Sequence, residues 1–256
     1  MFDEGPFRGR EAGLSGEASW RSVAACGGDF DANGFLDIYV SNISSSRNAL
    51  YLNNGDGTFS DVTLDTGTGD VGDGRNCAWV DFDGDGFLDL LSTNHLNPTK
   101  LFRNTGNGEF VDTAATVGVA SPIDVFAASW GDFNNDTYGD VFLNGHLGTA
   151  LMMNSGNANN NLILDLRGDG VMGNSSAIGA RVEVLGSKGA QIREVSGGKG
   201  CCDQDMLPVH FGLGKDRSVD IVVEWPGGSQ CSFDGVDISG GRILSIFQDG
   251  CDIVFR

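Results

Sequence analysis

Short apolar segments separated by turns rich in Gly, Asn and Asp fill the first part of the chain, and their order occurs three times. In each repeat a first apolar segment, at residues 38–40, 90–91 and 141–143, is followed by a second, at 50–52, 101–103 and 151–153. Each second segment leads into Asn-x-Gly, and in two repeats a Gly-x-Phe sequence opens a further short segment. Strands of this length between turn residues predict an all-β protein. A unit of about fifty residues with several strands has the size of one four-stranded propeller blade.

An acidic nonapeptide precedes the first apolar segment of each repeat, at residues 29–37, 81–89 and 132–140. Positions 1, 3, 5 and 9 carry oxygen-bearing side chains, and position 7 can offer a backbone carbonyl. Ca²⁺ prefers a shell of several oxygen ligands, so this spacing predicts about three calcium sites. The third loop carries Thr137 where the other two have a Gly that permits a sharp bend. The predicted side-chain ligands are Asp29, Asp31, Asn33, Asp37, Asp81, Asp83, Asp85, Asp89, Asp132, Asn134, Asp136 and Asp140, and Phe35, Phe87 and Tyr138 are expected to offer carbonyl oxygens with their side chains turned to the core.

Together, the acidic loops and the Asn-x-Gly turns resemble the FG-GAP/VCBS repeat, the calcium-loop blade of integrin-α-like β-propellers. The resemblance implies that the cation has a structural role in each blade. An EF-hand does not fit, because no Glu occupies position 12 and strands rather than helices flank the loops. Propellers close with about four to eight blades, whereas three repeats are recognisable here. We therefore expect either a fragment that lacks N-terminal blades or closure by self-association.

The repeat stops near residue 157, and a second β-rich region follows. Apolar and polar residues alternate at 181–185 and 219–225 between Gly clusters, which indicates a small antiparallel β-sandwich. Five stretches, at 161–168, 177–184, 191–198, 210–214 and 219–228, resemble the ASPIC/UnbV domain, which follows FG-GAP/VCBS repeats in the cartilage acidic protein-like family. The predicted organisation is a partial propeller over 1–157, with blades near 20–66, 72–118 and 124–157, and an ASPIC/UnbV domain over 158–256.

Charge narrows the range of partners. The 256 residues include 35 acidic and 16 basic side chains, which gives a net charge of −19. Nucleic acid and anionic membranes require clustered Lys and Arg, so both are excluded. No apolar run is long enough to span a bilayer, and we expect no membrane insertion. The first residues lack the features of a signal peptide, so any export signal is expected to lie outside this chain.

Six cysteines favour an oxidising compartment, in agreement with the secreted location that the resemblance implies. Cys26 and Cys77 lie one position out of phase before their loops, which leaves a bond between them open. The vicinal pair at 201–202 is expected to bond with partners such as Cys231 or Cys251.

The three histidines are expected to have structural roles. His95 and His146 occupy equivalent positions in successive repeats, each six residues past the end of its loop, where a turn residue is favoured over a metal or catalytic pair. His210 lies between two apolar residues and is expected to be a strand residue that hydrogen-bonds to a neighbour.

Two classes of function remain open. No nucleophile with an adjacent base is recognisable, which favours a non-enzymatic, calcium-binding extracellular protein. The resemblance implies adhesion, with a protein or glycan ligand on the propeller scaffold. The alternative is an accessory protein or enzyme of a secondary-metabolite or cell-surface pathway, acting through the C-terminal domain at Asp203, Asp205 and His210.

Overall fold

The protein is described by a computed structural model that covers residues 11–14, 21–44, 46–120, 124–171, 173–199 and 203–256. In this part of the chain nineteen strands form five sheets, and the two helices, α1 (Thr63–Thr66) and α2 (Ala114–Val117), have four residues each. The all-β prediction is therefore confirmed. Among the residues described, none of the helices is long and apolar enough to span a bilayer.

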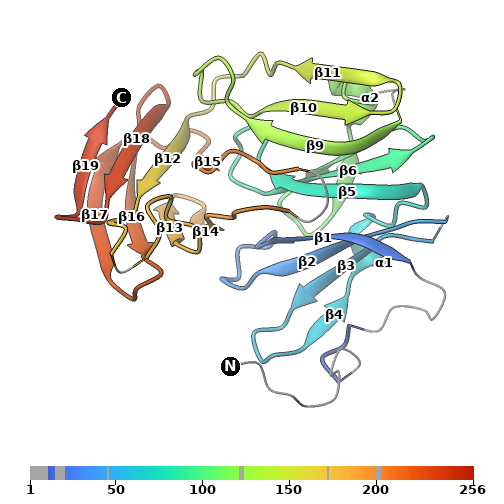
Figure 1. Ribbon diagram of the computed structural model, residues 1–256, viewed down its shortest axis with the longest axis horizontal. Coiled ribbons are helices and arrows are strands. Elements are labelled where there is room, and N and C mark those ends of the chain that lie inside the picture. The colour runs from blue at the N-terminus through green and yellow to red at the C-terminus, as the bar shows by residue number, and fades with distance from the viewer. Residues whose placement is uncertain (1–10, 15–20, 45, 121–123, 172, 200–202) are drawn as a thin grey trace.

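The first three sheets follow one another as propeller blades (Figure 1). In each, successive strands are antiparallel neighbours, and the acidic loop joins the first strand to the second. The Asn-x-Gly turn joins the third strand to the fourth in the first two blades. The strands are β1 (Ser22–Gly28), β2 (Asp37–Asn42), β3 (Ala49–Asn53) and β4 (Phe59–Asp61) in blade one, β5 (Asp73–Val80), β6 (Asp89–His95), β7 (Lys100–Asn104) and β8 (Phe110–Asp112) in blade two, and β9 (Val125–Gly131), β10 (Asp140–Gly145) and β11 (Gly148–Met152) in blade three.

Blade two is buried on both faces. Side chains alternate across a strand, so neighbouring residues point toward different blades. On β6, Leu90 packs in the cluster shared with blade one, and Leu91 packs in the cluster shared with blade three. Phe102 and Leu101 divide in the same way on β7, and none of the four is more than 5% exposed. This double burial explains why apolar residues run consecutively in these short strands.

A disulfide joins blades one and two, between Cys26 on β1 and Cys77 on β5, with the two Cα atoms 6.0 Å apart. The one-position phase difference between the two cysteines favours this bond. The front of one blade faces the back of the next. Side chains at the same repeat position would therefore point in the same direction, whereas side chains one position apart point toward each other. Both cysteines lie in the buried cluster between these blades.

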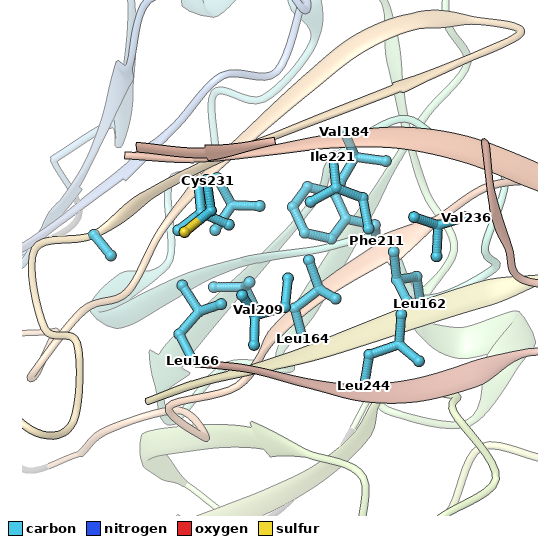
Figure 2. Packing of buried hydrophobic residues seen from close by; sticks show 14 of the residues in the cluster. Leu162, Leu164, Leu166, Val184, Val209, Phe211, Ile221, Cys231, Val236 and Leu244 are labelled. Carbon is cyan, nitrogen blue, oxygen red and sulfur yellow. The ribbon is translucent and has the colours of Figure 1, made fainter. Parts of the chain in front are cut away.

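The last two sheets pack face to face as the predicted sandwich. Their strand orders are β15-β12-β18-β19 and β14-β13-β16-β17, and inward side chains from both share one core around Phe211 (Figure 2). β12 and β18 pair in parallel, which corrects the expectation of a purely antiparallel sandwich. The strands are β12 (Asn161–Arg167), β13 (Arg181–Gly186), β14 (Gly189–Glu194), β15 (Val209–Gly212), β16 (Ser218–Glu224), β17 (Gln230–Asp237), β18 (Arg242–Phe247) and β19 (Asp252–Phe255).

A second disulfide, between Cys231 and Cys251, links the two sheets of the sandwich, with a Cα–Cα distance of 5.5 Å. Cys231 lies on β17 and Cys251 directly precedes β19, and these strands are the edges of the two facing sheets. Cys231 and Cys251 are therefore bonded to each other, and the prediction that they bond with residues 201–202 is wrong. Residues 201–202 themselves lie outside the described part of the chain.

Candidate metal centre

Each acidic loop is closed by its position-1 carboxylate. In the first loop, Asp29 accepts hydrogen bonds from the backbone N–H groups of Asn33 and Gly34, both at 3.0 Å. The second and third loops repeat this pattern with Asp81 and Asp132. The carboxylate thus bends the chain so that the side chains at positions 3 and 5 turn back toward position 1.

The position-9 carboxylate joins the loop to the next turn of the same blade. Asp37 is fully buried and accepts from the backbone N–H of Phe30 at 3.1 Å and of Asn53 at 2.8 Å. Asp89 and Asp140 do the same in their blades. Because Asn53 opens the Asn-x-Gly turn, this bridge explains why loop and turn occur together in every repeat.

Carboxylates converge in the first two loops. One oxygen from each of three residues lies within 4.8 Å of the others in each of two trios, Asp29, Asp31 and Asp37, and Asp81, Asp83 and Asp89. All of these donors are oxygens, which suits a hard cation such as Ca²⁺ and not a soft one. The donor set therefore fits the group that the sequence predicts.

The electrostatics of these loops favour a bound cation. Burial raises the pKa of Asp37 to about 7. Burial, together with the neighbouring Asp85 carboxylate, raises the pKa of Asp81 to about 7. Burial raises the pKa of Asp89 well above its ordinary value, and the charge of Asp81 adds to that effect. A divalent cation would offset both the burial and the mutual repulsion of these groups.

The third loop makes the same bend with a different residue. Thr137 has a φ of +72°, close to the +93° of Gly34 and +97° of Gly86 at the equivalent positions. A β-branched residue is strained in this region, so the third loop is held in shape at a cost in stability. Among the described residues the third loop has no carboxylate trio, because Asn134 stands where the other loops have Asp.

The position-7 aromatic side chains do not turn to the core, which corrects the prediction made for Phe35, Phe87 and Tyr138. Phe35 is 46% exposed, and its ring covers Gly55 of the Asn-x-Gly turn, where a Cβ would meet the ring at 2.6 Å. Phe87 and Tyr138 cover the equivalent glycines of their blades. The last residue of the Asn-x-Gly motif is therefore Gly for two reasons, a positive φ of +76° at Gly55 and the ring above it.

Every acidic loop contacts the sandwich through a backbone carbonyl. The guanidinium of Arg181 on β13 donates to the Gly34 carbonyl of the first loop at 2.7 Å. Lys188, in the turn between β13 and β14, donates to the Asp85 carbonyl of the second loop. On β15, His210 Nε2 lies 3.1 Å from the Thr137 carbonyl of the third loop. The candidate metal centres thus lie at the interface between blades and sandwich.

Arg103 on β7 belongs to the candidate site in the second loop, and the sequence interpretation missed it. Its Nε lies 2.5 Å from Asp83 Oδ2 and its Nη2 lies 2.8 Å from Asp85 Oδ2, so it partly neutralises the second loop. The equivalent positions in the other blades are the apolar Leu52 and Met153. A charge at a repeat position that is otherwise apolar was the signal that could have identified it.

The structure brings His95 and His146 close together, with ring centroids 6.4 Å apart. His95 Nδ1 lies 2.6 Å from Asp124 Oδ1, and the His146 ring packs edge-on against Phe126 at 4.1 Å between centroids. His95 ends β6 and His146 lies in the turn between β10 and β11. Both therefore occupy strand ends, and each has a structural contact.

Asp203 and Asp205, the candidates of the alternative hypothesis, bind the backbone of β9. Asp203 accepts from the N–H of Ala128 at 3.1 Å, and Asp205 accepts from the N–H of Trp130 at 2.7 Å. Lys199 bridges the two carboxylates and also donates to the Ala128 carbonyl at 2.7 Å. The side chains of Asp203, Asp205 and Lys199 thus hydrogen-bond to backbone groups of β9, which is the edge strand of its sheet and would otherwise leave those groups unpaired.

Two solved structures are similar to this chain only at a low level. A putative cell adhesion protein from Bacteroides uniformis is 12% identical, with a TM-score of 0.27, and the match covers 83% of this chain and 97% of that one. AofleA from Arthrobotrys oligospora is 11% identical, with a TM-score of 0.31 and coverage of 91% and 78%. Scores this low carry no argument about fold or function.

Sequence comparisons are more specific. An FG-GAP-like repeat family matches residues 29–92 and 81–143, and the ASPIC and UnbV family matches residues 170–251. Cartilage acidic protein 1 is 29% identical in Xenopus tropicalis and 27% identical in Homo sapiens, over 85% and 93% of this chain. The chain spans only 43% and 45% of those relatives, less than half of their length. The FG-GAP-like repeats, the ASPIC and UnbV domain and the similarity to cartilage acidic protein 1 together match the family that the sequence resembles.

Proposed function

We propose that this chain is a non-enzymatic, calcium-binding extracellular protein, and that its blades form a scaffold for recognition of a protein or glycan. The observation that carries the proposal is the convergence of three carboxylate oxygens within 4.8 Å in each of the first two loops. Carboxylates packed this closely in a partly buried site repel one another unless a cation joins them. The resident ion would supply charge neutralisation and rigidity at the loops, not chemistry.

The disulfides support an extracellular location, and the proposed calcium sites agree with it. The disulfides Cys26–Cys77 and Cys231–Cys251 persist in oxidising compartments. Calcium sites in extracellular modules bind with dissociation constants of about 10⁻⁴–10⁻³ M, a range that cytosolic calcium is too scarce to fill. The domain boundary at residues 157–158 stays a prediction, and the strands of the sandwich begin at Asn161.

Calorimetric titration of Ca²⁺ into metal-free protein tests the calcium part. We expect two to three sites and the loss of one site in Asp89→Asn, because Asp89 belongs to the second trio. Asp65→Asn makes the same chemical change at an exposed residue of α1 and should leave the titration unchanged. Absence of calcium-dependent heat, or equal titrations for both variants, contradicts the proposal.

Binding of the calcium-loaded protein to an array of glycans and extracellular matrix proteins tests the recognition part. We expect binding that is lost in EDTA and restored by Ca²⁺, because the loops stiffen the blades that present the surface. Binding that is equal in EDTA and Ca²⁺ refutes calcium-dependent recognition. Failure to bind any member of the array, with an intact calcium titration, refutes recognition and leaves calcium binding in place.

A further inference from the structure

A cavity of about 310 Å³ lies between the blades and the sandwich. Its walls come from the first strands of the three blades, β1, β5 and β9, and from parts of residues 192–199 and 204–210. Residues 203–208, which lead into β15, extend to these strands (Figure 1), and the Met206 N–H donates to the Trp130 carbonyl of β9 at 2.9 Å. A volume of this size is at the lower end of the range for small-molecule sites, about 300–1,000 Å³.

Two buried polar groups at this cavity have no hydrogen-bond partner in the described part of the chain. Trp130 lines the cavity and is 7% exposed, and its indole N–H is unpaired. The second is Nδ1 of His210, which also lines the cavity. The Thr137 carbonyl near Nε2 requires a hydrogen on that nitrogen, which leaves Nδ1 as an acceptor. Burial lowers the pKa of His210 to about 4, so the ring is neutral at neutral pH.

Arg193 gives the cavity a positive charge. Its guanidinium donates to the Ile192 carbonyl at 2.9 Å and to Gln191 Oε1 at 3.1 Å, and the group lies 5.2 Å from the centre of the Phe211 ring. Among the residues described it forms no ion pair with a carboxylate. A guanidinium has five N–H donors, and the charges of Asp81 and Asp29 offset only part of the cost of burying it.

The other charged groups of the lining are paired with neighbours. Asp205 is bound by Lys199 at 2.8 Å. Glu194 lies 3.6 Å from the Arg181 guanidinium. The Asp81 carboxylate accepts from backbone N–H groups of its own loop. Arg193 forms no direct ion pair among the described residues, although the charges of Asp81 and Asp29 act on it and partly offset the effect of burial on its pKa.

We propose that this cavity binds a small organic carboxylate that also carries a hydroxyl or amine donor. The carboxylate would accept from Arg193 and from the Trp130 indole N–H, and the donor would satisfy His210 Nδ1. Apolar side chains of the lining, among them Trp79 and Leu88, suit a compact hydrocarbon or aromatic body. The site adjoins the acidic loops, because Asp81 and Leu88 of the second loop line it, and it would take an anion where the loops would take a cation.

The test uses 3-phenyllactate, which combines a carboxylate, a hydroxyl and a phenyl group, and its uncharged amide as a matched probe. Titration of the whole calcium-loaded protein by calorimetry should show saturable binding of 3-phenyllactate with one site and at least tenfold weaker binding of the amide. Arg193→Met and Trp130→Phe should each weaken the binding at least tenfold. Arg217→Gln, which removes an exposed Arg of the same sandwich, should leave it unchanged.

Nitrogen NMR of the three imidazoles gives a readout that loss of fold would not mimic. In the wild-type protein, 3-phenyllactate should shift the Nδ1 resonance of His210 and leave those of His95 and His146 in place. Absence of saturable binding up to the solubility limit overturns the proposal. Equal binding of the amide, or an unshifted His210 with saturable binding elsewhere, also overturns it.

Discussion

Without divalent cations, this protein should lose stability as the pH rises from about 4 to about 7. Asp81 in the second acidic loop is 1% exposed, and burial raises the pKa of its carboxyl group to about 7. An Asp in an unfolded chain titrates near 3.9. Between about pH 4 and pH 7 the ion-free folded protein therefore holds a proton that the unfolded chain has released.

The magnitude follows from these two values. Stability falls with rising pH wherever the folded state binds more protons than the unfolded state. Each pKa unit corresponds to about 1.4 kcal/mol, so this one carboxyl lowers the free energy of unfolding by about 4 kcal/mol across the window. Asp37, whose pKa burial also raises to about 7, acts in the same direction. Ca²⁺ binds the ionised carboxylates, so at one hundred times its dissociation constant it adds about 2.7 kcal/mol per site above pH 7.

Urea denaturation followed by tryptophan fluorescence measures this effect, at about pH 5 and about pH 7.5 with EDTA or with saturating Ca²⁺. In EDTA the protein should be more stable at the lower pH, and Ca²⁺ should stabilise it chiefly at the higher pH. Asp81→Asn should weaken the pH dependence in EDTA, whereas the exposed Asp65→Asn should retain it. A metal-free protein whose stability rises with pH over this range would refute the reasoning.

Three further changes test the packing. Replacing both Cys26 and Cys77 by Ser opens a cross-link over 51 residues and should lower the free energy of unfolding by about 4 kcal/mol in urea titrations; an unchanged value would contradict an intact bond. Gly212→Ala places a Cβ against the Asp81 carboxylate and should cost about 1–3 kcal/mol by the same assay, with weaker calcium binding; wild-type stability and calcium affinity would show that the contact yields freely. Phe211→Ala removes a fully buried ring from the sandwich core and should cost about 3–5 kcal/mol, which thermal denaturation would detect; a loss below 1 kcal/mol, on the scale of a surface change, would refute its place in the core.

The repeat could be predicted from sequence because its constraints are local. Asp29 closes its loop onto residues four and five positions later, and Asp37 reaches back seven positions to Phe30. Such contacts impose fixed spacings, which appear directly as a residue pattern. The Asn-x-Gly turn follows the same logic, because Asn53 donates to Asp37 from the next hairpin. The blades and the sandwich were therefore predictable, whereas the binding of calcium by the loops stays a prediction.

What sequence could not supply depends on how elements face each other. The positions of Cys26 and Cys77 in their repeats did not show whether the two would bond. The answer depends on how the blades stack, because the front face of one blade contacts the back face of the next. Phe35 looked like a core residue by composition, yet its ring has a place above the turn only because Gly55 lacks a side chain. Arg193 carried no signal, since its position between backbone and side-chain acceptors, without a direct ion pair among the described residues, is a property of the assembled interface.

The acidic loops and the sandwich are coupled through shared backbone groups. Arg181 donates to the carbonyl of Gly34, and the N–H of the same Gly34 is held by the Asp29 carboxylate. His210 contacts the Thr137 carbonyl, and the Thr137 N–H is held by the position-1 carboxylate of the third loop. At Gly34 and at Thr137, the backbone N–H therefore points to the carboxylate of its own loop, and the backbone carbonyl points to the sandwich. A cation that fixes the carboxylates also fixes the carbonyls on which the sandwich docks, so the strength of this interface depends on the state of the loops.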